Sequence, residues 1–186
     1  GAEAGEPIGR HMDIDMVSFT GSTVTGKKFL GYSAESNAKE VVLEMGGKNP
    51  AVVMDDAENL DRVAQHVVNG AFWNMGENCS ATSRLIVHKN IKAELLDRIS
   101  HHAKQWNVGN PLDPETRLGA LVSQTHFDKV CSYLARADNV LFGGGAKNGF
   151  VEATMVELSG NDVALARDEI FGPIMSVIEI SSFDQA

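Results

Sequence analysis

Residues 50–72, PAVVMDDAENLDRVAQHVVNGAF, place a short run of β-branched residues directly before a strongly periodic segment. The periodic segment is apolar at spacings of i, i+3, i+4 and i+7, which is typical of one face of a helix. Its apolar positions are Leu60, Val63, Ala64, Val67, Val68, Ala71 and Phe72. A second strand pattern, RLIVHK at 84–89, follows. A strand, a helix and another strand in this order predict a βαβ unit with parallel strands.

The same alternation continues on both sides of this unit. The first strand of the unit is expected at PAVVMDD (50–56). Before it, strands are expected at MVSFT (16–20) and KEVVLEMGG (39–47), with a helix from about 26 to 33. After it, helices are expected over 91–106 and 124–137, two extended segments with glycine-rich turns over 140–156, and a last strand over 173–180. We therefore predict an α/β fold with three layers and a mostly parallel sheet flanked by helices.

Composition narrows the classes of partner. The 186 residues include 43% hydrophobic ones and carry a net charge of −9, which disfavours nucleic acid and anionic membranes as partners and favours a small molecule. No apolar run approaches the roughly 20 residues of a membrane span, and the N-terminal segment lacks the pattern of a signal peptide. The expected location is therefore the cytoplasm, with Cys79 and Cys131 as free thiols. The chain begins with Gly1 and ends in SSFDQA, so we expect a piece of a longer protein.

The segment FTGSTVTGKK (19–28) is a first candidate for ligand binding. Gly21 and Gly26 flank a strand-to-helix turn, where backbone N–H groups and the helix dipole favour an anion. The spacing is close to the nucleotide-binding P-loop G-x-x-x-x-G-K-[ST], with Asp55 at the end of a second strand, but Lys28 stands where the hydroxyl residue belongs. A phosphate site and an ordinary turn both remain open.

Two further candidates carry reactive groups. Glu44 ends a predicted strand just before Gly46 and Gly47, where desolvation would raise its pKa toward that of a general base, although strand-end carboxylates are often solvated. Cys79 lies in the polar segment GENCSATSR (76–84), whereas Cys131 belongs to the apolar side of a predicted helix. Cys79 is thus either a nucleophile or a small loop residue. No cysteine or histidine spacing predicts a metal site.

The last candidate is RDEIFGPIMSVI (167–178), in which Glu169 and Phe171 precede a Gly-Pro turn and the final strand. Taken alone, these two residues are explained equally well as surface and core. The four segments occur in one order along the chain: FTGSTVTG, LEMGGKNPAVV, GENC and EIFGP. This ordered set resembles the NAD(P)-dependent aldehyde dehydrogenase superfamily, and the resemblance runs through nearly the whole chain.

The resemblance implies oxidation of an aldehyde to a carboxylic acid with NAD or NADP, in a homodimer or homotetramer. Cys79 matches the family nucleophile, which forms a thiohemiacetal and then a thioester, and Glu44 matches the general base that activates water. The cofactor-binding positions it implies are Gly21, Ser22, Gly26, Glu169 and Phe171. It also implies the end of a dinucleotide-binding domain over 1–45 and part of a catalytic domain over 46–186.

The chain also departs from the family pattern. Glu77 stands where glutamine is frequent, and a carboxylate near the thiol is expected to raise the thiol pKa or to change substrate preference. The 186-residue piece alone is expected to be nearly inactive. Two alternatives remain at this point: a P-loop-like nucleotide-binding protein, and a catalytically silent scaffold of the same family.

Overall fold

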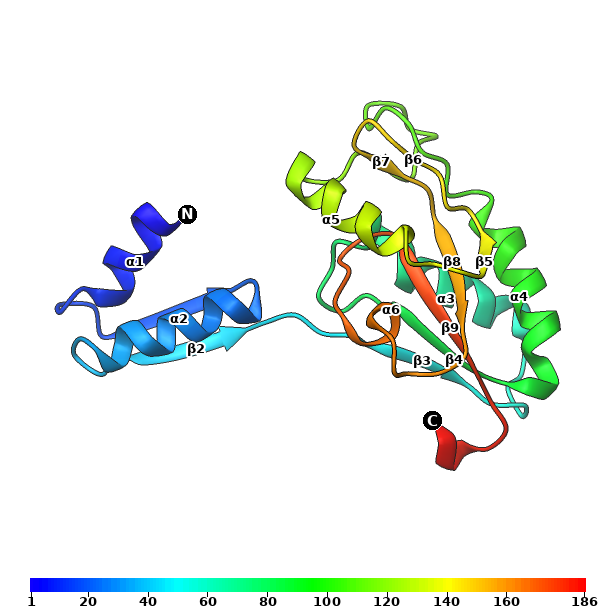
Figure 1. Ribbon diagram of the computed structural model, residues 1–186, viewed down its shortest axis with the longest axis horizontal. Coiled ribbons are helices and arrows are strands. Elements are labelled where there is room, and N and C mark those ends of the chain that lie inside the picture. Colours follow the sequence, from blue (N-terminus) through cyan, green and yellow to red (C-terminus); the bar gives the residue numbers. More distant parts are fainter. The chain divides into compact units, whose positions relative to one another are not determined.

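A computed structural model describes residues 1–186, and the chain divides into two compact units, Gly1–Gly47 and Lys48–Ala186 (Figure 1). The division falls two residues after the predicted boundary at 45. Each unit is described by itself below.

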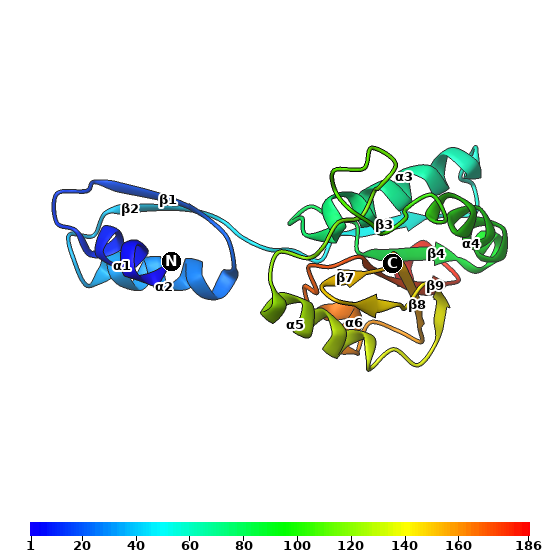
Figure 2. The same cartoon turned by 90° about the horizontal axis from the view of Figure 1, so that it is seen from above.

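The first unit is a small βαβ element with an additional helix. Strand β1 (Met16–Thr20) pairs in parallel with β2 (Glu40–Glu44), and α2 (Thr23–Ala34) connects them. Helix α1 (Ala2–Arg10) lies beside α2 on the same side of the two strands (Figure 2). The core of this unit is aromatic: the centroid of the Phe29 ring lies 4.9 Å from that of Phe19 and 5.8 Å from that of Tyr32. Sequence reasoning missed α1, because the face that it packs against α2 is formed by Gly5 and Gly9 rather than by a periodic set of apolar residues.

Helix α2 begins earlier than the sequence predicted. The side chain of Ser22 accepts a hydrogen bond from the backbone N–H of Thr25 at 3.2 Å and so caps the helix. Gly26, expected to open the helix, therefore lies inside it. The candidate phosphate loop is reduced to a two-residue turn, Gly21 and Ser22.

The second unit contains a five-stranded sheet in the order β3-β4-β9-β8-β5. Its strands are β3 (Pro50–Val53), β4 (Arg84–His88), β5 (Val140–Phe142), β8 (Thr154–Leu158) and β9 (Ile174–Ile180). All adjacent pairs are parallel except β5 with β8. The βαβ prediction for 50–89 is confirmed, since β3 and β4 pair in parallel on either side of α3 (Leu60–Phe72).

Helices cover both faces of this sheet, so the predicted three layers are confirmed. Helices α3 and α4 (Lys89–Ala103) lie on one face, and α5 (Gln124–Leu134) and the short α6 (Ala164–Arg167) lie on the other (Figure 2). Neighbouring residues of one strand serve different cores: Met155 packs with α3 and α4, and Val156 packs with α5 and α6. This period of two is the geometry of a strand buried on both faces.

Several local predictions were wrong or incomplete. The segment 140–156 holds four short strands rather than two, because β6 (Ala146–Lys147) and β7 (Phe150–Val151) form a hairpin between β5 and β8. Its turn residues Asn148 and Gly149 have φ of 55° and 87°, which suits an Asn-Gly turn. Helices α4 and α5 end three residues earlier than expected. The 3-10 turns η1 (Trp73–Gly76) and η2 (Phe183–Gln185) were not predicted. None of the helices has the length and apolar character needed to cross a membrane.

Candidate active site

The segment from Trp73 to Ser83, called here the Cys79 loop, connects α3 to β4. Its first turn has an unusual backbone, with φ of 52° at Asn74, 56° at Met75 and 68° at Gly76. A Cβ atom on Gly76 would lie 2.3 Å from the carbonyl oxygen of Gly172. Only glycine fits there, so the Cys79 loop packs directly against the segment 168–173, called here the Phe171 loop.

Cys79 is exposed within this loop. Its carbonyl oxygen accepts a hydrogen bond from Nδ2 of Asn49 at 2.9 Å, and Asn78 accepts from the backbone N–H of Ser80 at 3.2 Å. These bonds hold the loop on both sides of the thiol. The backbone N–H of Cys79 donates to no acceptor in the chain, so it is available to a developing oxyanion.

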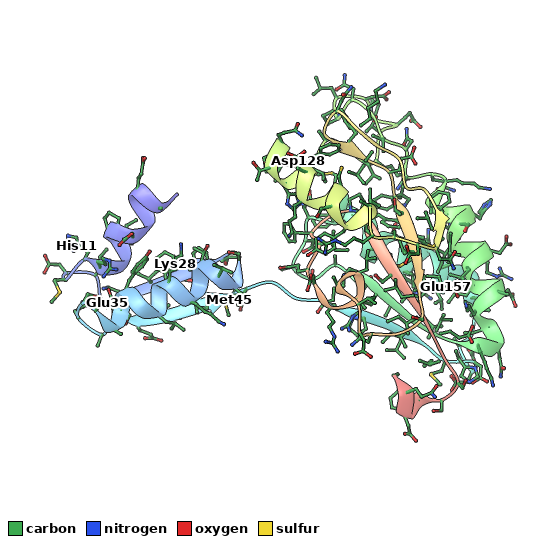
Figure 3. All side chains as sticks on the ribbon, in the orientation of Figure 1. His11, Lys28, Glu35, Met45, Asp128 and Glu157 are labelled. Carbon is green, nitrogen blue, oxygen red and sulfur yellow. The ribbon has the colours of Figure 1, made fainter.

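Cys131 is a different kind of thiol. It lies half-buried on α5, where burial and the charge of Asp128 raise its pKa. Figure 3 shows Asp128 on the same helix. A raised pKa lowers the thiolate fraction and hence the reactivity. Of the two thiols, the exposed Cys79 is therefore the better candidate for a nucleophile. No group of three or more His, Cys, Asp or Glu side chains is arranged to hold a metal ion.

The carboxylate of Glu77 has its partners on α5 and on the segment that leads into it. Its side chain is 8% exposed, and Oε1 accepts a hydrogen bond from the backbone N–H of Val122 at 3.1 Å. The same oxygen is 3.4 Å from Nε2 of His126. The sequence suggested that this carboxylate acts on the thiol of Cys79, whereas the contacts that the structure gives it are with Val122 and His126.

The Phe171 loop is held from the same helix. Nε2 of His126 donates to the carbonyl oxygen of Phe171 at 2.6 Å, and Nζ of Lys129 donates to the carbonyl oxygen of Glu169 at 3.0 Å. The hydroxyl of Tyr133 donates to Asp168 at 2.9 Å, and burial together with this carboxylate raises the Tyr133 pKa. Phe171 itself has a φ of 61°, a conformation that is rare for an aromatic residue.

Lys48 supplies a buried positive charge near this loop. Its Nζ is inaccessible to solvent and has no hydrogen-bond partner. Burial, followed by the charge of Arg84, lowers its pKa to about 8, while Asp168 and Glu169 act in the opposite direction. Lys48, His126 and Lys129 were missed by sequence reasoning. His126 and Lys129 lie outside the quoted segments, and Lys48 lies inside one with no feature marking it as buried.

The first unit holds the other predicted residues. The backbone N–H of Gly21 donates to the carbonyl oxygen of Glu44 at 3.0 Å, so the turn after β1 meets the end of β2. The carboxylate of Glu44 is exposed, contrary to the desolvated position considered from the sequence. The backbone N–H groups of Thr23 and Val24, at the start of α2, donate to no acceptor in the chain.

Gly26 has a packing role that the sequence did not reveal. A Cβ atom there would lie 2.7 Å from the sulfur of Met45, which Figure 3 marks at the end of the first unit. Glycine thus permits α2 to approach the end of β2. Its role in cofactor binding stays a prediction.

The P-loop alternative is wrong. In such a protein the residues between the two glycines form a loop that wraps a phosphate, whereas here Thr23 to Gly26 are already helical. The strand that ends near Asp55 also belongs to a different sheet from β1.

Each unit thus brings together part of the predicted site. Cys79, Glu169 and Phe171 belong to two loops in contact in the second unit, and Gly21, Ser22 and Glu44 belong to the first. The pairing of Glu44 with Cys79 stays a prediction, because it joins residues of different units.

Known proteins are similar to this chain in sequence and fold. The sequence profile of the aldehyde dehydrogenase family matches residues 1–186. An aminoacetaldehyde dehydrogenase of Pseudomonas aeruginosa is 60% identical over all of this chain and 38% of its own length. The crystal structure of a gamma-glutamyl-gamma-aminobutyraldehyde dehydrogenase from Burkholderia cenocepacia aligns with a TM-score of 0.95 and 40% identity, over 99% of this chain and 39% of that one.

A third relative is an indole-3-acetaldehyde dehydrogenase of P. syringae, solved as a cysteine-to-alanine mutant in complex with NAD+ and IAA. It aligns with a TM-score of 0.93 and 38% identity, over 96% of this chain and 38% of that one. The chain belongs to the aldehyde dehydrogenase family. It spans about two fifths of the length of these relatives.

Proposed function

We propose that the whole protein containing this chain oxidises an aldehyde to a carboxylic acid with NAD+ or NADP+. The observation that carries the proposal is Cys79, an exposed thiol with a free backbone N–H, in a loop that packs against the Phe171 loop. Membership of the aldehyde dehydrogenase family over 1–186 supports it. The mutant of the P. syringae relative, which holds NAD+ and IAA without its cysteine, adds support.

In the proposed mechanism the thiolate of Cys79 attacks the aldehyde carbon and forms a thiohemiacetal. Its oxyanion accepts a hydrogen bond from the backbone N–H of Cys79. Bound NAD(P)+ supplies the acceptor for the hydride that leaves this carbon. The resulting thioester is hydrolysed by water from which Glu44 removes a proton, so the acid departs and the thiol is regenerated.

The residues present suit a dinucleotide. The free N–H groups at the start of α2, a helix of 12 residues with no acidic residue in its first turn, favour a pyrophosphate. Ser22 lies beside them with its hydroxyl already in the helix cap, so it would reach a phosphate by sharing that hydrogen bond. Glu169 would hold the nicotinamide ribose, with Phe171 beside the ring.

The names of the relatives indicate a class of substrate for the proposed reaction. The P. aeruginosa relative is named for aminoacetaldehyde, and several plant relatives at 37 to 40% identity are named for aminoaldehydes or betaine aldehyde. We therefore expect a short aldehyde that carries an amino or a quaternary ammonium group. A homodimer or homotetramer in the cytoplasm is part of the same proposal.

The test is a spectrophotometric assay of NADH formation by the whole protein with aminoacetaldehyde, betaine aldehyde and indole-3-acetaldehyde. Turnover is expected with NAD+ or NADP+, and Cys79→Ala is expected to lower it by about 10⁴-fold or more, as removal of a nucleophile does. Cys131→Ala is the matched control and should retain turnover.

Two results would contradict the proposal. One is aldehyde oxidation by Cys79→Ala at the parental rate. The other is an inactive parent whose Cys79 reacts with iodoacetamide no faster than a cysteine in a model peptide, which would favour the catalytically silent scaffold.

A further inference from the structure

One face of α5 holds the Phe171 loop at three points. His126, Lys129 and Tyr133 are spaced i, i+3 and i+7, so they lie along one side of the helix. They donate hydrogen bonds to Phe171, Glu169 and Asp168 respectively, at 2.6, 3.0 and 2.9 Å. Two of the three acceptors are backbone carbonyls, so the helix fixes the path of the main chain.

Apolar packing supports the same contact. Val130, which is fully buried on α5, lies so close to the loop that a Cβ atom on Gly172 would come within 2.9 Å of it. The loop therefore has little freedom to move toward the helix, and its position is set by the residues along this face.

Glu77 connects the Cys79 loop to this arrangement. Phe171 O and Glu77 Oε1 lie 2.6 and 3.4 Å from Nε2 of His126, and both neighbours are hydrogen-bond acceptors. Nε2 must therefore carry the proton and donate it. Glu77 also accepts from the backbone N–H of Val122, which fixes the carboxylate beside the ring.

The hydrogen bond from His126 to Phe171 stabilises a strained backbone conformation. A φ of 61° at a non-glycine residue is strained, and such a conformation persists only where its surroundings hold it. The bond from His126 holds the carbonyl group of the strained residue itself. The rings of His126 and Phe171 also meet edge to face, with centroids 6.0 Å apart.

We infer that Glu77 and His126 are positioning residues that hold Glu169 and Phe171 in the conformation that accepts the nicotinamide end of the cofactor. The inference rests on the proposed function. It assigns Glu77 to cofactor binding through His126, in place of an effect on the thiol of Cys79.

The test uses the whole enzyme and compares disruptive with conservative variants. His126→Phe keeps a ring but removes the donor, and Glu77→Leu keeps the volume but removes the acceptor. Each is expected to raise the KM for the cofactor about 3- to 10-fold, the effect of one lost hydrogen bond, and to leave the KM for the aldehyde unchanged. His126→Gln and Glu77→Gln retain a donor and an acceptor and should stay near the parental values.

A second measurement distinguishes an effect of Glu77 on the Phe171 loop from an effect on the thiol of Cys79. The rate at which iodoacetamide alkylates Cys79 without cofactor should be the same in the parent and in Glu77→Leu. His101→Phe, which changes an exposed histidine on α4 whose side chain makes no hydrogen bond, is the matched control for the ring substitution. Lys129→Met removes an exposed side chain that holds the same loop, and it should raise the cofactor KM even if His126→Phe does not fold.

The outcomes are distinguishable. An active parent in which His126→Phe and Lys129→Met leave the cofactor KM unchanged overturns this inference alone. Slower alkylation in Glu77→Leu with an unchanged cofactor KM overturns it as well and assigns Glu77 to the nucleophile. A parent without aldehyde oxidation overturns the proposed function instead.

Discussion

At the scale of single residues, Lys48 is the side chain whose charge is least well accommodated. Its ammonium group is buried without a hydrogen-bond partner, and burial lowers its pKa from 10.5 to about 8. A buried, unpaired charge costs free energy in the folded state. The position therefore reduces stability at neutral pH, and this cost depends on pH.

We predict that Lys48→Met raises the free energy of unfolding at pH 7 by on the order of 1 to 3 kcal/mol. Between pH 8 and 10.5 the unfolded lysine binds more protons than the folded one, so parental stability rises with pH across this window relative to the variant. Urea unfolding of both proteins at several pH values measures the difference. A difference in the free energy of unfolding between the two proteins that does not narrow as pH rises would contradict the prediction.

At the scale of elements, Lys92 ties α4 to the sheet. Its ammonium group is hydrogen-bonded to Glu157 on β8 and to Glu179 on β9. Figure 3 marks Glu157 on its strand. These carboxylates raise the pKa of Lys92. Since the Lys92 side chain is only 19% exposed, we expect the Lys92–Glu157 ion pair to contribute more to the stability of the fold than a typical surface ion pair does.

We predict that Lys92→Met lowers the free energy of unfolding by about 1 to 2 kcal/mol, because it leaves Glu157 without its cation. Urea unfolding at pH 7 provides the measurement. Lys104→Met, an exposed lysine at the end of the same helix, should change stability far less. Equal losses of unfolding free energy in the two variants would mean that the ion pairs of Lys92 stabilise the fold no more than an exposed lysine does.

At the scale of the whole molecule, the proposed chemistry draws on both units. Cys79 belongs to Lys48–Ala186 and Glu44 to Gly1–Gly47. The first half-reaction requires the thiol, and the second requires a base for water. The two halves can therefore be separated by substitution.

We predict that Glu44→Gln in the whole enzyme retains a first turnover of NADH formation but loses steady-state turnover by about 10²- to 10⁴-fold, because the thioester is no longer hydrolysed. Rapid-quench and stopped-flow measurements follow the acyl-enzyme and the burst. Glu40→Gln, an exposed carboxylate on the same strand, is the control. Loss of the burst with no acyl-enzyme would assign Glu44 to the first half-reaction.

Elements with a strong local signal were predictable. The strand 16–20 and the helix 60–72 have the bounds that their residue patterns indicated. Helix α1 was not, because it meets the aromatic residues of α2 at Gly5 and Gly9, which leave no apolar period in the sequence. The order of the four segments was sufficient to indicate the family, since each segment lies within a short stretch of chain.

The sequence by itself determined the α/β class, the family and the identity of the candidate site residues, because periodicity and motif order are properties of neighbouring residues. The tertiary structure alone decided what those residues contact. Glu77 meets Val122 and His126 meets Phe171 across 45 residues of chain in both cases. No local pattern encodes such pairs, since they arise only when the sheet brings the Cys79 loop, α5 and the Phe171 loop together.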